Sequence, residues 1–250
     1  MRVKENKAGR IVVFVILMIA LLSVLRWLTG KIITVYWDKL LFNELCVLVI
    51  VYTINKVYFK IPLAFKREKL KKGVLLGIPV LIPALINYSQ IKQIPTITLT
   101  IKLIFFSIIV GCFEEILFRG VLLRSLARRW QGLKNGSAWA LIVTSLFFGL
   151  AHLTNLTHQS LGSTLYQVEF AFSLGMILGG IYLRSHNLFL CIFLHALIDS
   201  GAFIANWMNK SITISLPIIW ILIVGIIIFT PYCLLGLFYI RPNKQMELLK

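Results

Sequence analysis

Charged residues are scarce in this chain, and acidic residues are the scarcest. Only 14% of its 250 residues are Asp, Glu, Lys or Arg, whereas 59% are hydrophobic. An ordinary soluble domain carries about 25% charged residues and less apolar material. One water-soluble core could not hide so much apolar surface. The composition therefore excludes an ordinary soluble globular protein and favours an integral membrane protein.

Cysteine is also rare, and no two cysteines form a Cys-x-x-Cys motif. Cys46, Cys112, Cys191 and Cys233 all lie in apolar stretches, so a disulfide framework is not indicated. We interpret them as small buried hydrophobic residues. Cys191 lies one helical turn before His195, and ligation of a metal by its thiol is the weaker alternative.

Long apolar runs dominate what is present. A membrane-spanning helix needs about 20 mostly apolar residues. The candidate spans cover residues 11–28, 40–59, 73–90, 98–127, 137–153, 166–183, 187–206 and 213–240. Pro79 and Pro83 predict a kink in the third of these segments. The sequence therefore predicts an all-α, polytopic membrane protein with about eight transmembrane helices.

The net charge of +17 reflects membrane topology rather than binding to nucleic acid. Basic residues gather in alternate connecting segments, near residues 2–10, 60–72, 124–134, 184 and 241–250. Such a bias is typical of cytoplasmic loops, and these residues would face anionic lipid headgroups of one leaflet. We therefore expect a multi-pass protein of the cell membrane with cytoplasmic N- and C-termini and no nucleic-acid partner.

The chain divides into three predicted regions. Residues 1–97 hold three N-terminal spans without a recognisable motif, and residues 98–206 hold all the polar motifs described below. Residues 207–250 hold the last span and a cytoplasmic tail. No internal repeat and no low-complexity segment is evident.

The fourth predicted span contains two adjacent carboxylates, Glu114 and Glu115, followed by Arg119. An ionisable residue at a span centre costs about 2.5–3.5 kcal/mol and usually marks function. Glu115 and Arg119 are four residues apart and can pair on one helix face. Glu114 points about 100° away from Glu115 and is left without the arginine partner. A buried carboxylate without such a partner is a candidate general base. The structural alternative is an ion pair that only holds helices together.

Two later spans each carry a histidine. Phe148 and His152 are four residues apart, as are His195 and Asp199. A carboxylate one turn from a histidine commonly orients the imidazole. The structural alternatives are a His152 that donates to a neighbouring carbonyl and a satisfied polar pair at a helix interface. Helix rise from the cytoplasmic edges places all three motifs at compatible depths, so they can meet.

Other polar residues in the spans carry less weight. Glu169 lies near the outer end of the sixth span, and we interpret it as an interfacial or supporting residue rather than a catalytic one. Gly175, Gly179 and Gly180 have the spacing of small residues at a close helix contact.

The series Glu-Glu-x-x-x-Arg, Phe-x-x-x-His and His-x-x-x-Asp, in this order on separate spans, resembles a known family. This is the CPBP family of CAAX proteases and bacteriocin-processing enzymes, also called the Abi family. The resemblance covers roughly residues 98–206 and implies an intramembrane endopeptidase. By this resemblance, Glu114 and His152 activate the attacking water. Glu115 and Arg119 would support these two residues.

The resemblance assigns the last motif to the oxyanion or to a metal. His195 and Asp199 would stabilise the oxyanion or help to bind a metal, although the family often has asparagine where this chain has Asp199. An ionised aspartate would repel an oxyanion. Asp199 must therefore be protonated, orient His195 or help to hold a metal.

The family is commonly labelled as metalloproteases. Two histidines and a glutamate, here His152, His195 and Glu114, suit zinc with a water in the fourth position. A metal-free reaction of glutamate and histidine needs the same residues. A divalent metal such as zinc and a metal-free mechanism therefore both stay open.

The sequence predicts an endopeptidase that hydrolyses a peptide bond of a peptide or membrane-protein substrate. The resemblance implies a role in bacteriocin processing or self-immunity. One alternative is a non-catalytic immunity protein that binds a bacteriocin or its target. The other is a proton-coupled transporter, in which buried Glu and His form a relay. Against transport, the polar residues lie at one level, and the two halves show no matching broken helices. No oligomeric state is predicted.

Overall fold

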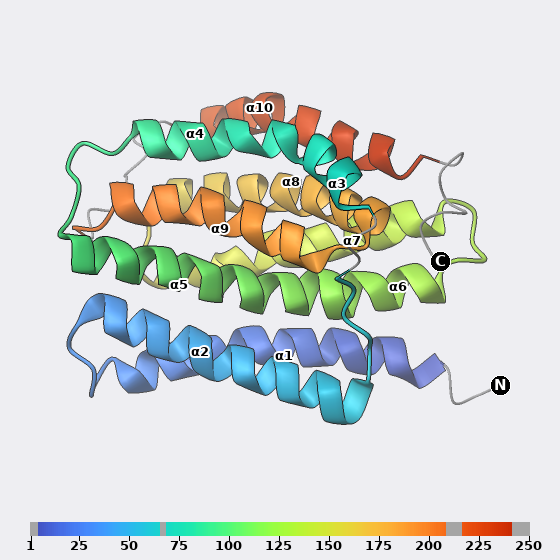
Figure 1. Ribbon diagram of the computed structural model, residues 1–250, viewed down its shortest axis with the longest axis horizontal. Coiled ribbons are helices and arrows are strands. Elements are labelled where there is room, and N and C mark those ends of the chain that lie inside the picture. Colours follow the sequence, from blue (N-terminus) through green and yellow to red (C-terminus); the bar gives the residue numbers. More distant parts are fainter. Residues whose placement is uncertain (1–4, 66–68, 209–216, 242–250) are drawn as a thin grey trace. The chain divides into compact units, whose positions relative to one another are not determined.

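The computed structural model describes residues 5–65, 69–208 and 217–241. Every regular element in these ranges is a helix, and none of their residues forms a β-strand (Figure 1). The predicted all-α class is therefore confirmed. Several basic residues of the chain lie outside the described residues, as do the first residues of the last predicted span. These basic residues are Arg2, Lys4, Lys66, Arg67, Lys210, Lys244 and Lys250.

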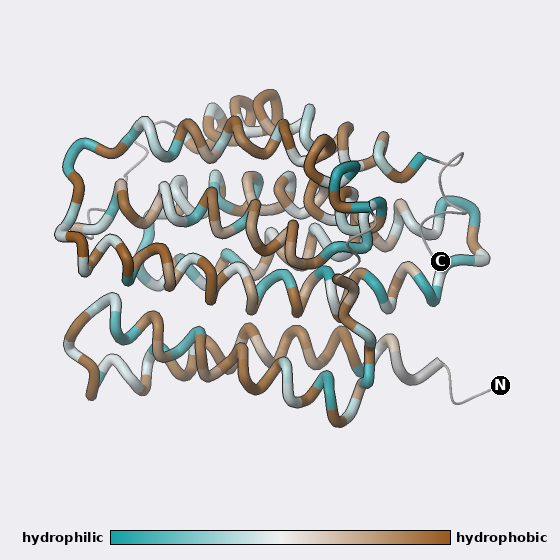
Figure 2. Tube along the Cα trace, viewed as in Figure 1, coloured by the Kyte–Doolittle hydropathy of each residue, from teal (hydrophilic) through white to brown (hydrophobic). Residues whose placement is uncertain are grey.

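Helices long and apolar enough to cross a membrane account for most of the described chain. They cover Ala8–Thr29, Tyr36–Phe59, Leu70–Ser89, Gly136–Thr157, Leu161–Ser185, Leu188–Ala205 and Ile218–Tyr239. Figure 2 shows these helices as mostly hydrophobic, with hydrophilic residues frequent in the connecting loops. Each corresponds to one predicted span, so the polytopic membrane class is confirmed. The cytoplasmic placement of both termini stays a prediction.

The predicted span 98–127 forms a longer and more highly charged helical path. α5 (Ile97–Glu115) passes directly into η4, a π-helix over Ile116–Leu123, and then into α6 (Arg124–Arg129). This path carries the Glu-Glu motif. π-helical turns are rare and frequently occur at functional sites. The motif therefore lies where the helix geometry changes.

The described helices divide between two compact units. The first contains α1 (Glu5–Thr29), α2 (Tyr36–Ile54), η2 (Asn55–Phe59), α4 (Leu81–Ser89), α5, η4 and α9 (Leu188–Ala205). Within it, α5 and α9 lie side by side, α2 packs on α1 and α5, and α4 packs on α9 (Figure 1). Gly111 allows the close approach of α5 and α9, because a Cβ there would lie 3.1 Å from the carbonyl oxygen of Ile192.

The second unit is built around α8 (Leu161–Ser185). This helix packs against α3 (Leu70–Gly77), α7 (Gly136–Ala151) and α10 (Ile218–Tyr239). Two glycines of α8 confirm the predicted close packing. A Cβ at Gly175 would lie 2.9 Å from Ser145 Cβ, and one at Gly180 would lie 2.9 Å from the carbonyl oxygen of Gly236.

The third predicted span is interrupted where its prolines predict a kink. A 3₁₀ turn, η3 (Ile78–Val80), contains Pro79 and separates α3 from α4. Proline lacks the backbone N–H that an α-helical hydrogen bond requires.

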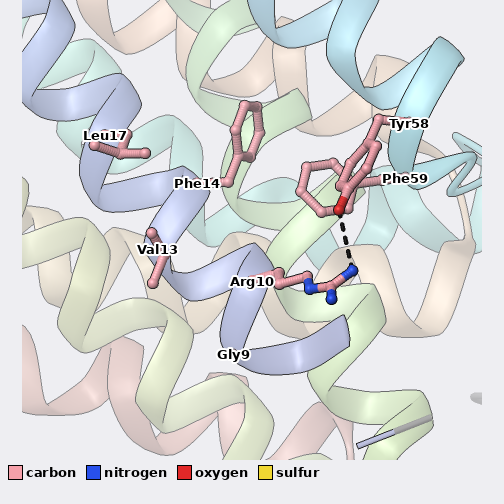
Figure 3. A pocket seen from close by; sticks show the side chains of 7 residues that line it. All are labelled: Gly9, Arg10, Val13, Phe14, Leu17, Tyr58 and Phe59. Carbon is pink, nitrogen blue, oxygen red and sulfur yellow. Dashed lines mark hydrogen bonds between the residues drawn. The ribbon is translucent and has the colours of Figure 1, made fainter. Parts of the chain in front are cut away.

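An open groove lies between α1 and η2 of the first unit (Figure 3). It is lined by Gly9, Arg10, Val13, Phe14, Leu17, Tyr58 and Phe59. Arg10 Nη1 donates a hydrogen bond to the hydroxyl of Tyr58 at 3.2 Å, at the polar side of an otherwise apolar lining. Arg26, near the other end of α1, is about 24 Å away along the helix. The groove is thus separate from the polar residues that surround Arg26.

Candidate active site

The Glu115–Arg119 ion pair forms at the junction of α5 and η4, as the four-residue spacing predicts. Arg119 Nη1 lies 2.9 Å from Glu115 Oε1, and both side chains are fully buried. The path stays helical through this junction, so Glu115 and Arg119 remain on one face. A buried carboxylate needs such a partner, because an uncompensated charge in an apolar interior is costly.

The same carboxylate also orients His195 on the neighbouring helix α9. His195 Nδ1 donates a hydrogen bond to Glu115 Oε1 at 2.7 Å. A ring with one nitrogen held in this way presents its other nitrogen in a fixed direction. Sequence reasoning missed this contact, because spacing within one helix does not report which helices pack together.

Two further carboxylates lie at the other nitrogen of the ring. Glu114 Oε2 is 3.3 Å from His195 Nε2, and Asp199 Oδ2 is 3.5 Å from the same nitrogen. The predicted closeness of His195 and Asp199 is therefore observed. Asp199 lies at Nε2, however, whereas the hydrogen bond that anchors the ring comes from Glu115 at Nδ1.

Exposure separates the two sides of the imidazole. The side chains of Glu115 and Arg119 are 0% and 1% exposed, whereas those of Glu114 and Asp199 are 19% and 20% exposed. The described residues therefore cover the carboxylates on the Nε2 side less completely than Glu115 and Arg119, which are sealed. Glu114, His195 and Asp199 form what we call the reactive cluster, and Glu115 and Arg119 anchor it.

His152 lies at the end of α7, where η5 (His152–Thr157) begins in the second unit. Its Nδ1 contacts the carbonyl oxygen of Phe148 at 2.9 Å, and the two rings meet edge to face at 5.2 Å. The carbonyl contact matches the structural alternative expected for this histidine. It also fixes the ring, which a catalytic histidine requires. Participation of His152 in the reactive cluster stays a prediction.

Helix α4 contributes polar contacts beside Asp199 that sequence reasoning missed. Asn87 Nδ2 donates to the carbonyl oxygen of Ile198 at 3.0 Å, and the hydroxyls of Tyr88 and Ser200 are 2.7 Å apart. The available signal was an Asn-Tyr pair in an otherwise apolar span. These contacts tie α4 to the residues on both sides of Asp199.

An ion pair between α1 and α2 was also missed. Arg26, near the end of the first predicted span, lies in the last turn of α1 and contacts Glu44 of α2 at 2.6 Å. The signal was one acidic residue within the second apolar span, Glu44.

The donor sets within the described ranges give no metal site. No group of three or more His, Cys, Asp or Glu side chains among these residues has an arrangement that could hold a metal ion. Glu115 Oε1, the best-placed acceptor, already contacts Arg119 and His195. Ligation of a metal by Glu114, His152 and His195 stays a prediction. None of the four cysteines, all of which lie among the described residues, forms a disulfide.

Comparison with known proteins gives one family match, and this match covers the segment that holds these residues. A family model described as Type II CAAX prenyl endopeptidase Rce1-like matches residues 96–201. The match begins at the N-cap of α5, ends within α9 and includes all three motifs. No curated protein matches the chain. The match confirms the resemblance drawn from the motifs. Residues 96–201 are thus similar to the Rce1-like type II CAAX prenyl endopeptidases, and this chain is a multi-pass membrane protein.

Proposed function

We propose that this chain hydrolyses a peptide bond of a peptide or membrane-protein substrate, with a water activated by Glu114. One observation carries the proposal. The accessible carboxylate of Glu114 lies 3.3 Å from a histidine nitrogen whose ring is anchored, through its other nitrogen, by a sealed carboxylate. An anchored ring and an accessible base are what a hydrolytic site needs to orient water against a carbonyl carbon.

The reaction follows from the positions of these groups. Glu114 accepts a proton from water, and the water oxygen attacks the carbonyl carbon of the scissile bond. In this proposal His195 is an imidazolium with a proton on each nitrogen, and its Nε2–H stabilises the tetrahedral oxyanion that forms. Glu114 then returns the proton to the leaving nitrogen, the C–N bond breaks, and a carboxylate and an amine are released. His152 is the proposed second residue at the attacking water.

Glu115 and Arg119 serve this reaction without touching the substrate. Glu115 fixes the orientation of the His195 ring through the 2.7 Å hydrogen bond at Nδ1, and Arg119 neutralises the charge of Glu115. Asp199 lies on the Nε2 side at 3.5 Å. Its carboxylate attracts the positive charge of the His195 imidazolium, a role in which asparagine would serve less well.

The biological setting is the finer part of the proposal. Following the family resemblance, the substrate is a peptide or a membrane-tethered segment whose maturation or destruction serves bacteriocin processing or self-immunity. The protein would act in the cell membrane with both termini in the cytoplasm. If immunity instead depends only on binding a bacteriocin, Glu114→Gln would leave it intact, because that variant removes the base and keeps the shape.

The decisive experiment is cleavage by purified protein in liposomes, with products identified by mass spectrometry. One probe is a farnesylated peptide ending in Cys-aliphatic-aliphatic-X, and the other is an unprenylated peptide with a single membrane span. We expect the wild type to cleave at least one probe and Glu114→Gln to cleave neither. Failure of the wild type on both probes, or equal cleavage by the variant, would remove the proposed function.

The same preparation tests the metal prediction. Bound divalent metal is quantified in the wild type and in the Glu114→Gln and His195→Gln variants. Stoichiometric zinc that both substitutions release would support ligation by these side chains. A metal content that neither substitution changes would count against it.

A further inference from the structure

Helix α4 holds the part of α9 that carries Asp199, although α4 lies outside the segment that matches the family. α4 covers Leu81–Ser89, whereas the match begins at residue 96, so nothing in that match assigns a role to α4. Both helices belong to the first unit and lie side by side (Figure 1). Contacts made by α4 therefore bear on the helix that supplies His195 and Asp199.

Two consecutive residues of α4 form hydrogen bonds on either side of Asp199. Asn87 Nδ2 donates to the carbonyl oxygen of Ile198 at 3.0 Å, and the hydroxyls of Tyr88 and Ser200 are 2.7 Å apart. One bond holds the backbone just before Asp199, and the other holds the side chain just after it. A rotation or a slide of this turn of α9 would break both.

The direction of the second bond follows from the proton of Ser200. Its hydroxyl donates to the carbonyl oxygen of Leu197 at 3.0 Å, within α9 itself. A serine hydroxyl has one proton, so Tyr88 donates in the contact between the two hydroxyls. α4 thus supplies both donors, and α9 supplies both acceptors.

Gly201 brings the two helices within reach of these bonds. A Cβ at this position would lie 3.0 Å from Asn87 Cβ and 3.0 Å from Tyr88 Cδ2. A glycine inside a helix costs about 0.5–1 kcal/mol relative to alanine. This turn of α9 is therefore weaker by itself, and its close contact with α4 compensates for that weakness.

α9 is thus attached to two neighbours around the reactive cluster. His195 donates to Glu115 of α5 at 2.7 Å, and the next turn of α9 is bound to α4. Asp199 lies between these attachments, with its Oδ2 3.5 Å from Nε2 of His195. A displacement of about 1 Å in a reacting group can cost much of the rate, so the second attachment matters to the proposed reaction.

We propose that Asn87 and Tyr88 are positioning residues of the reactive cluster: their hydrogen bonds to Ile198 and Ser200 fix the turn that carries Asp199 and keep its carboxylate at Nε2 of His195. The catalytic part of this inference rests on the proposed function. It extends the site from the matched segment to α4, which supplies no reacting atom.

The kinetic test removes the two donors and keeps the bulk of the side chains. With a probe that the wild type cleaves, the double variant Asn87→Leu/Tyr88→Phe should lower kcat about fivefold and change KM less than about twofold. In an Asp199→Asn background the same change should lower kcat less than about twofold, because the carboxylate that it positions is gone. An unchanged kcat, or effects that multiply, would overturn the inference. Tyr88→Phe alone, which removes a single hydroxyl, gives the same comparison in a milder variant.

Two matched controls separate positioning from a general loosening of the unit. Ser89→Ala removes a hydroxyl of α4 whose hydrogen bond, to the carbonyl oxygen of Ile86, stays within that helix, and it should leave kcat unchanged. Asn43→Leu removes another amide that donates between helices of the first unit, to Thr29 at 2.9 Å. It should lower the melting temperature about as much as Asn87→Leu without lowering kcat. An equal fall of kcat in Asn43→Leu would overturn the inference.

A second test needs no turnover and separates this inference from the proposed function. The whole chain, labelled with ¹⁵N-histidine, is studied by NMR in detergent, and the His195 ring resonances are those that His195→Gln removes. The Asn87→Leu/Tyr88→Phe variant should move them in the same direction as Asp199→Asn does, and Ser89→Ala should not move them. Resonances that stay in place in the double variant would overturn the inference even if the chain is a peptidase. A chain that cleaves no probe but shows the shift would lose the proposed function alone.

Discussion

Glu114 and Glu115 are neighbours in the sequence but lie on opposite sides of the His195 imidazole. Glu115 is sealed, contacts Arg119 and accepts the hydrogen bond from Nδ1, whereas Glu114 is 19% exposed and lies at Nε2. Two identical side chains thus receive different surroundings from one step of helical rotation. In the proposed reaction, Glu115 orients the ring of His195, whereas Glu114 activates the attacking water. Matched substitutions can test this division.

The largest effect is expected at the accessible carboxylate. Glu114→Gln removes the general base and should lower kcat by about 10²- to 10⁴-fold, with little change in the free energy of unfolding. The measurement is single-turnover cleavage of a probe peptide, together with thermal melting in detergent. A variant that melts well below the wild type would place Glu114 with the anchoring residues instead.

The same change one residue later should act mainly on stability. Glu115→Gln breaks a buried ion pair and leaves Arg119 uncompensated, which should cost about 3–5 kcal/mol of unfolding free energy. Denaturant unfolding, followed by the helical circular dichroism signal, measures this loss. A double variant, Glu115→Gln with Arg119→Met, should recover part of the stability but little activity, because His195 stays unanchored. If Glu115→Gln kept the stability of the wild type, Glu115 would not be the anchoring carboxylate that the comparison assigns.

The sequence predicted the interactions that lie within one helix and missed those between helices. The Glu115–Arg119 pair and the closeness of His195 to Asp199 follow from 3.6 residues per turn, which holds wherever the helix packs. The bond from His195 to Glu115 depends on α5 and α9 lying side by side. Apolar spans resemble one another on every face, so hydrophobic periodicity could not specify that pairing.

The boundaries of the spans show the same limit. Most predicted spans correspond to helices within a few residues, because length and hydrophobicity decide whether a segment can cross a membrane. The transition from α5 to the π-helix η4 was not predicted, since no residue pattern marks it. The ion pair of Arg26 with Glu44 was not predicted, because composition does not report which apolar helices pack together.

A smaller effect is expected at the second accessible carboxylate. Asp199→Asn keeps the size of the side chain and removes a partly exposed charge 3.5 Å from His195 Nε2. Such a contact is worth about 1 kcal/mol, so kcat should fall tenfold or less. Steady-state cleavage across pH 5 to 9 measures this change. A loss as large as that of Glu114→Gln would make Asp199 an equal partner in proton transfer, and the two carboxylates could no longer be ranked.

The smallest effect is expected at the exposed ion pair of the first unit. Lys102→Gln removes the partner of Asp38, and both side chains are well exposed, so the unfolding free energy should change by about 1 kcal/mol or less. Arg26→Gln is the matched change at the buried pair, where Glu44 would be left uncompensated at 1% exposure. There the loss should be several-fold larger, because water cannot replace the missing partner. Both free energies come from denaturant unfolding in the same detergent. Equal losses would mean that burial does not distinguish the two pairs.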